Sequence, residues 1–122
     1  MRMASEPPGA GPIVTGFGTG GFKVGDDYLP AALLTVEAAT RWTPPVLADL
    51  DIATLQPLVD AKPEFILIGT GATLRRPPPA LVRALDAAGI GLEVMDSRAA
   101  ARAWGVLRGE GRMIAAALYP LD

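Results

Sequence analysis

Apolar residues in the second half of the chain alternate between short continuous runs and helically spaced positions. The run Phe65-Ile66-Leu67-Ile68 is typical of a strand covered on both faces, whereas Leu81 and Leu85 repeat at the spacing of one helix face. The same patterns recur further on and predict strands over 65–69, 91–95 and 112–119, with helices over 79–88 and 97–108. Elements in this order predict a right-handed parallel β-α-β-α-β unit with helices on both faces of the sheet.

The first half of the chain has a shorter, strand-like rhythm. Residues 13–15 begin a strand, and the runs 22–24 and 28–29 flank the polar turn Gly25-Asp26-Asp27, as in a hairpin. The apolar run 32–36 predicts a buried strand. These strands either join the parallel unit in antiparallel orientation or pack beside it as a separate hairpin.

One further helix is predicted in the middle of the chain. Thr54 suits its N-cap, Pro57 is tolerated in the first turn, and Lys62 before Pro63 closes it. Together the elements predict a single mixed-sheet α/β domain over residues 13–122. Residues 1–12 contain prolines and no apolar stretch, and they predict a flexible tail.

The composition narrows the available chemistry. The chain has no cysteine and no histidine. Disulfides, thiol nucleophiles, thiolate metal sites and Ser-His or Cys-His catalysis are therefore excluded. Only carboxylates, lysine, threonine, tyrosine or a borrowed cofactor remain, and no set of metal or cofactor ligands is recognisable. We expect a protein that is not an enzyme and that holds no metal or cofactor.

Charge is distributed unevenly along the chain. The formal net charge is −2, which offers no global attraction to nucleic acid. Every basic residue after position 74 is an arginine, and these arginines are either a solvated surface or a face that grips an acidic partner. No apolar run is long enough to span a membrane, so we expect a cytoplasmic protein, with peripheral membrane association left open. The arginines are Arg75, Arg76, Arg83, Arg98, Arg102, Arg108 and Arg112.

The candidate ligand crevice follows the strand over 65–69. Gly69-Thr70-Gly71 stands at the carboxyl end of that strand, where α/β sheets bind ligands, and Arg75 and Arg76 could pair with a phosphate. Leu74 occupies the place of the third glycine of a dinucleotide fingerprint, and Pro77-Pro78-Pro79 lack the N–H groups of an anion site. The alternative interpretation is a tight structural turn after a core strand.

Asp96 ends the neighbouring predicted strand. Its carboxylate could face the same crevice and act as a base or hold a ribose. It could equally be the N-cap of the helix over 97–108. The predicted crevice residues are Gly69, Thr70, Gly71, Arg75, Arg76 and Asp96.

The order and spacing of many short segments, none specific alone, resemble a known family. The segments are Gly21-Phe22 with Val24 and Gly25, Leu33-Leu34, Trp42, Phe65 to Ile68 with Gly69-Thr70-Gly71, Gly89-Ile90, Glu93, Asp96, Leu107, Glu110-Gly111-Arg112, and Ala116-Ala117-Leu118 before Pro120. From Ile13 to Pro120 the chain resembles domain-of-unknown-function family 498, which has the Mth-938-like fold.

The resemblance implies a mixed-sheet α/β fold and no known enzymatic activity. The family includes the mitochondrial NADH:ubiquinone oxidoreductase complex assembly factor 3, which implies a protein partner and a role in assembling a respiratory or membrane complex. Members usually carry Thr, Cys and Asn where this chain has Ser97, Ala101 and Gly105. Two hypotheses follow: a non-enzymatic interaction protein, or a binder of an anionic metabolite or nucleotide in the crevice over 69–76.

Overall fold

The computed structural model describes residues 11–122. Most of the predicted flexible tail over 1–12 therefore lies outside the described residues. Its last residue is held in place, because the indole Nε1 of Trp104 donates a hydrogen bond of 2.8 Å to the carbonyl oxygen of Pro12. Trp104 is completely buried, so this bond ties the start of the described chain to the core.

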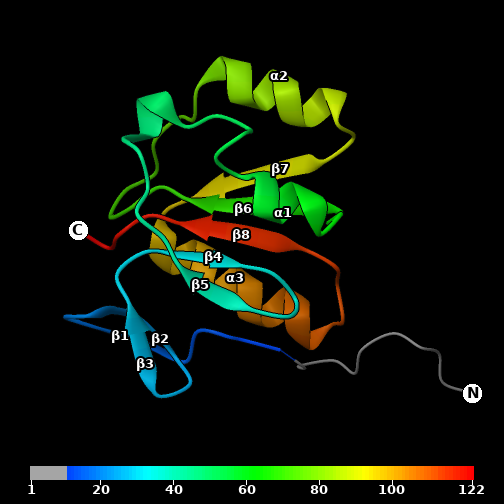
Figure 1. Cartoon of the computed structure of the whole chain (residues 1–122). Helices are drawn as coiled ribbons and strands as arrows, with labels where there is room; N and C mark the ends of the chain where they lie inside the picture. The colour runs from blue at the N-terminus through cyan, green and yellow to red at the C-terminus, as the bar shows by residue number, and fades with distance from the viewer. Residues whose placement is uncertain (1–10) are drawn as a thin grey trace, which may run out of the picture.

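The centre of the molecule is a five-stranded sheet in the order β5-β4-β8-β6-β7 (Figure 1). Strand β6 pairs in parallel with both β7 and β8, whereas β4 pairs antiparallel with β8 and with β5. The parallel unit and the mixed sheet are confirmed. The strands are β4 (Ala32–Leu34), β5 (Ala39–Arg41), β6 (Phe65–Gly69), β7 (Gly91–Met95) and β8 (Ala115–Leu118).

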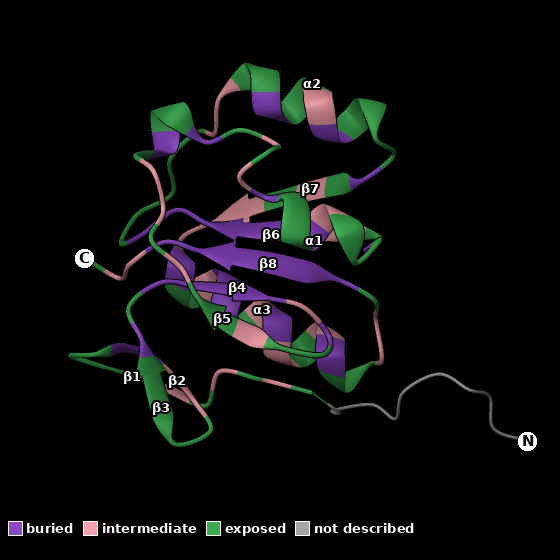
Figure 2. Ribbon diagram, viewed as in Figure 1, coloured by how far each residue is buried: buried purple, intermediate pink, exposed green. Residues whose placement is uncertain are grey.

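Side chains of the central strands alternate between two hydrophobic cores. In β6, Ile66 and Ile68 face one core and Leu67 faces the other. In β8, Ala115 and Ala117 face the same core as Ile66 and Ile68, and Ala116 faces the same core as Leu67. Both sets are buried, which explains why these strands have continuous apolar runs instead of alternation with polar residues (Figure 2).

Helices cover both faces of the sheet, as predicted. On one face lie the 3-10 helix η1 (Leu47–Asp49), α1 (Gln56–Asp60) and α2 (Pro79–Ala87), and α3 (Ser97–Gly109) covers the other (Figure 1). Pro79 at the first position of α2 needs no N–H partner there.

The first strands form a separate small sheet. Strands β1 (Gly16–Gly18), β2 (Gly21–Val24) and β3 (Asp27–Leu29) pair antiparallel and pack against α3 through Phe22 and Leu29. Both arrangements considered for the N-terminal half therefore occur, since β4 and β5 join the main sheet and β1 to β3 stand beside it.

Two local predictions need correction, and one strand was missed. Thr54 does not cap α1, because the helix begins at Gln56 and the Thr54 hydroxyl donates to Asp51 Oδ1 at 2.7 Å. The last strand spans Ala115–Leu118 and is shorter than the predicted 112–119, because the N–H of Arg112 still donates to the carbonyl of Leu107 at the end of α3. Strand β5 was not predicted.

Candidate functional site

The turn after β6 is held by hydrogen bonds within the protein. The N–H of Thr70 donates to the carbonyl of Met95 at 2.9 Å, and the N–H of Gly71 donates to Ser97 Oγ at 2.8 Å. The Thr70 hydroxyl accepts from the N–H of Arg75 at 3.0 Å and donates to the carbonyl of Thr73 at 2.7 Å. These three amides, which a phosphate cradle would use, already have partners.

Ser97 joins the turn to the end of β8. Its side chain is buried, and its hydroxyl donates to the carbonyl oxygen of Tyr119 at 2.8 Å. The N–H of Ser97 returns a bond of 2.8 Å to the carbonyl of Gly71. A Cβ on Gly69 would lie 2.8 Å from Ser97 Cα, so glycine allows the strand and helix to approach. This geometry favours a structural turn.

Asp96 caps α3. Its Oδ1 accepts a hydrogen bond of 2.9 Å from the N–H of Ala99, which satisfies one of the unpaired donors at the helix start. The same carboxylate lines none of the hollows described below. Of its two predicted roles, the geometry supports the N-cap.

Arg75 and Arg76, which follow the turn after β6, line two adjoining hollows. One hollow, of about 640 Å³, runs between η1 and the start of α2, and the other, of about 380 Å³, reaches Val94 of β7. They share Arg76 and Pro77, and we call the pair the arginine–proline groove. Its residues are Ala48, Leu74, Arg75, Arg76, Pro77, Pro78, Pro79, Val82, Arg83 and Val94.

The groove combines exposed hydrophobic residues with one sign of charge. Leu74 is 65% exposed and Val82 is 41% exposed, so two large aliphatic side chains of the groove reach solvent. Every charged residue of the groove is an arginine. Within residues 11–122, no side-chain hydrogen bond or ion pair engages any of these guanidinium groups.

The sequence identified Arg75 and Arg76 but placed them in a different site. The structure places Arg76 beside Ala48 and Val82 and Arg75 beside Leu74 and Val94, and Asp96 lines neither hollow. One signal for the groove was present in the sequence. Val82 lies off the buried stripe of Leu81 and Leu85, and it follows three prolines at the start of the helix.

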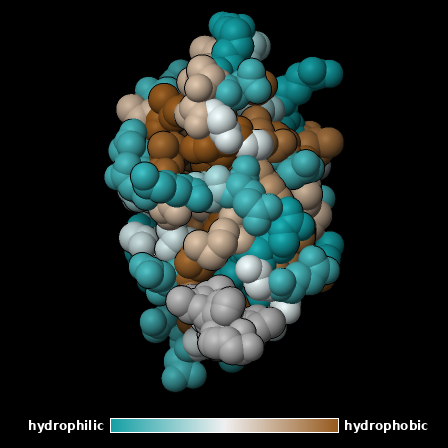
Figure 3. Space-filling model, turned by 90° about the vertical axis from the view of Figure 1, so that its right-hand side faces the viewer, coloured by the Kyte–Doolittle hydropathy of each residue, from teal (hydrophilic) through white to brown (hydrophobic). Residues whose placement is uncertain are grey.

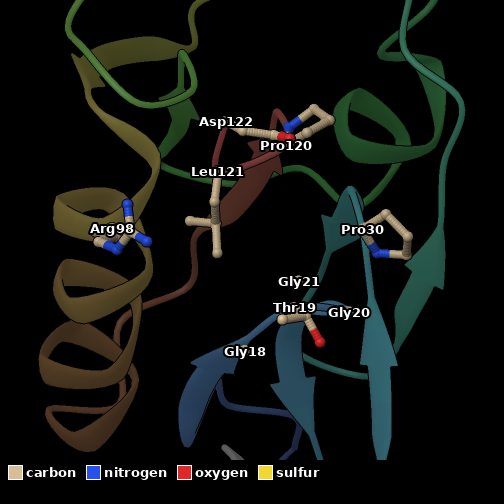
Figure 4. A pocket seen from close by; sticks show the side chains of 9 residues that line it. All are labelled: Gly18, Thr19, Gly20, Gly21, Pro30, Arg98, Pro120, Leu121 and Asp122. Atoms are coloured by element: carbon tan, nitrogen blue, oxygen red, sulfur yellow. The ribbon is translucent and has the colours of Figure 1, made fainter.

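A more polar hollow of about 470 Å³ lies between the β1–β2 turn, the start of α3 and the end of the chain (Figure 4). Arg98 and Asp122 bring charges of opposite sign to it. The Arg98 guanidinium also lies 5.6 Å from the centre of the Phe17 ring, where it makes a cation–π contact. No pattern in the sequence predicted this hollow.

The opposite end of the molecule, where the parallel strands begin, has hydrophobic residues gathered over its upper half (Figure 3). A depression of about 530 Å³ there contains Val59 and Ile90 together with Asp60 and Lys62. Its two charges have opposite signs, so this end lacks the uniform charge of the arginine–proline groove.

The pKa of Tyr119 is strongly shifted by its surroundings. Its ring meets Trp42 edge to face with centroids 5.3 Å apart, and its hydroxyl is buried without a hydrogen-bond partner among the described residues. Burial raises the pKa of Tyr119 to about 12, against the opposing effect of the positive charge of Arg75.

Residues 11–122 contain no cluster of three or more acidic side chains that could hold a metal ion. None of the helices there is both long and apolar enough to cross a membrane.

The sequence pattern of a family described as a protein of unknown function, DUF498/DUF598, matches residues 14–119. The chain belongs to this family. A DUF498 relative from Rhodobacter capsulatus, an uncharacterized protein, is 36% identical over 98% of this chain and 94% of its own length. The NADH dehydrogenase [ubiquinone] 1 alpha subcomplex assembly factor 3 of Danio rerio is 29% identical over 98% of this chain and 71% of its own.

The DUF498 fold is also shared with solved structures. The solution structure of a Bordetella pertussis protein, described as a Mth938-like domain, superposes with a TM-score of 0.79 at 29% identity. The match covers 100% of this chain and 94% of that one. The resemblance inferred from sequence segments is therefore confirmed, and so is the mixed α/β fold that it implied.

Proposed function

We propose that this chain is a protein-binding domain of the assembly-factor kind, without catalytic activity of its own. The observation that carries the proposal is the arginine–proline groove, in which hydrophobic side chains stay exposed beside unpaired arginines. Exposed apolar residues rimmed by polar ones are typical of protein-interaction sites. The three consecutive prolines fix their own φ angles, so little conformational entropy is lost when a partner binds.

The relative from Danio rerio supports a role of this kind. It is named as an assembly factor of NADH dehydrogenase (ubiquinone), and the similarity extends over nearly the whole of this chain. We extend the proposal to the assembly of a respiratory or membrane complex. The turn after β6 supports the non-enzymatic part, because its amides and Asp96 are engaged in holding the fold.

Affinity purification with paired variants tests this function. The groove variant carries Arg76→Glu and Val82→Glu. The control variant carries Arg102→Glu and Val106→Glu, which makes the same replacements on exposed positions of α3. We expect a reproducible set of proteins to be recovered with the wild type and the control variant and lost with the groove variant. Identical recovery by all three proteins would refute the proposed use of the groove.

A second candidate function is the binding of an anionic metabolite or nucleotide near residues 69–76. Arg75 and Arg76 favour it, because both line the hollow of about 380 Å³ beside this turn and, among the described residues, neither guanidinium has a side-chain hydrogen bond or ion pair. A thermal-shift screen of nucleotides and phosphorylated metabolites tests this candidate. A ligand at tenfold excess over its Kd stabilises the protein by about 1.4 kcal/mol. We expect a ligand that binds at this site to stop raising the melting temperature when Arg75 and Arg76 are replaced by Ala.

A further inference from the structure

The floor of the groove consists of the apolar residues Val82, Pro78, Pro79 and Ala48. Val82 lies on α2 beside Leu81 and Leu85, which are buried, but Val82 itself is 41% exposed. Pro78 and Pro79 form the adjacent surface, and Ala48 of η1 faces the same hollow. Small or rigid residues on these sides leave an open apolar surface that their own side chains do not fill.

The charge around this floor has one sign. Arg76 and Arg83 contribute the only charges of the larger hollow, and Arg75 adds a third positive charge on the adjoining one. The chain as a whole has a net charge of −2. The groove thus carries only positive charge on a chain of net negative charge, and a negatively charged segment is attracted there.

We propose that the arginine–proline groove binds an acidic segment of a partner protein, with an aliphatic or aromatic side chain of that segment seated on Val82 and the prolines. This inference rests on the proposed protein-binding function and adds the chemistry of the partner. Exposed arginine–carboxylate pairs contribute little affinity individually, so the hydrophobic contact provides most of the binding and the carboxylates select and orient the segment.

Other polyanions fit the groove less well. A nucleic-acid strand or an anionic membrane would place phosphates against the arginines, but the net negative charge of the protein opposes a large polyanion. The groove also presents none of the aromatic rings on which exposed bases stack. A short acidic segment with one hydrophobic anchor matches both the charge and the floor.

Peptide titrations monitored by NMR of the isotope-labelled full chain test the inference. The probe is a short peptide with leucines flanked by glutamates. Two counterparts replace either the glutamates by lysine or the leucines by serine. We expect the first peptide to shift the amide signals of Ala48, Val82 and Arg83, and each counterpart to bind about tenfold more weakly or worse. Arg76→Glu with Val82→Glu should abolish binding, whereas Arg102→Glu with Val106→Glu should leave it unchanged.

The outcomes separate this inference from the function on which it rests. Equal binding of the lysine peptide, no binding of the acidic peptide, or shifts confined to another surface would overturn the acidic-segment assignment. Vesicles of anionic lipid or a single-stranded oligonucleotide that bind the groove more tightly than the acidic peptide would also overturn it. If proteins recovered by affinity purification are still lost with the groove variant, protein binding stands and only the partner chemistry is wrong. If nothing depends on the groove in either experiment, both fail.

Discussion

The hydroxyl of Ser97 accepts a hydrogen bond of 2.8 Å from the backbone N–H of Gly71. The same hydroxyl donates to the carbonyl of Tyr119. One buried side chain thus fastens the start of α3 to the turn after β6 and to the residue that follows β8. The turn after β6 lies at the carboxyl edge of the sheet, where many α/β proteins bind ligands, and in this protein that turn is a hydrogen-bonded junction.

Removing the Ser97 hydroxyl should weaken the fold. Ser97→Ala leaves the N–H of Gly71 and the carbonyl of Tyr119 without their partner in a buried place, and we expect a loss of about 1–3 kcal/mol in the free energy of unfolding. Urea denaturation followed by circular dichroism measures this loss. Thr43→Ala, which removes an exposed hydroxyl, is the control and should change stability by less than about 0.5 kcal/mol. A Ser97→Ala protein as stable as the wild type would show that the junction is not needed.

Asp96 should behave as a helix cap. Asp96→Ala removes the acceptor for the N–H of Ala99 and should lower stability by about 0.5–2 kcal/mol. Asp96→Asn keeps an oxygen acceptor, so we expect its stability to stay close to that of the wild type. Chemical denaturation of the two variants side by side makes the comparison. A larger loss for Asn than for Ala would mean that the carboxylate has a role other than capping.

Gly105 offers a stabilising substitution. It lies inside α3, and a Cβ at this position meets no described atom within 4 Å. Gly105→Ala should therefore raise the free energy of unfolding by about 0.5–1 kcal/mol, because alanine loses less backbone entropy in a helix. Gly111→Ala is the contrasting variant and should destabilise, since Gly111 has a φ of 78°. Thermal and urea unfolding report both changes. A Gly105→Ala protein that is less stable would reveal an unseen contact at that face.

The pKa of Tyr119 predicts a loss of stability in alkali. The folded-state pKa of about 12 lies above the ordinary value of 10.0, so the folded protein keeps a proton that the unfolded chain releases. The contribution of Tyr119 is fully present below about pH 10 and is lost as the pH rises from there toward about pH 12. Tyr119→Phe should therefore lose less stability than the wild type over this range. Near neutral pH the variant should be equally stable or slightly more stable, because it removes a buried hydroxyl without a partner.

Urea unfolding at a series of pH values measures the difference between the two proteins. The difference isolates Tyr119 from the other groups that titrate in alkali. Parallel curves for wild type and Tyr119→Phe would contradict the buried, neutral phenol.

The sequence predicted the parallel half of the fold well because its core strands are continuous apolar runs. Strand β6 at Phe65–Gly69 and β7 at Gly91–Met95 have the predicted bounds. Strand β5 was not predicted because Ala39–Arg41 is short and largely exposed, so it has no apolar pattern to identify it. It pairs with β4 across a turn in which the N–H of Thr35 donates to the carbonyl of Ala38. Such a strand depends on its neighbour more than on its own pattern.

The candidate site was harder to predict because it depends on side-chain direction. Gly69 and Asp96 were identified from their places at strand ends, but their contacts with Ser97 and Ala99 become visible only when the segments meet in space. Arg76 lines a groove with Ala48, which comes from a distant segment before β6. No periodicity in the sequence specifies that meeting.

Photo-crosslinking from the two exposed valines tests the central claim most directly. A benzoylphenylalanine replaces Val82 in the groove or Val106 on α3, which are 41% and 63% exposed respectively. The chain is then irradiated in the cells from which it comes. We predict discrete protein adducts from position 82 and none of the same identity from position 106. Two results would contradict a protein-binding role for the arginine–proline groove. One is the same adducts from both positions, and the other is no adduct from position 82.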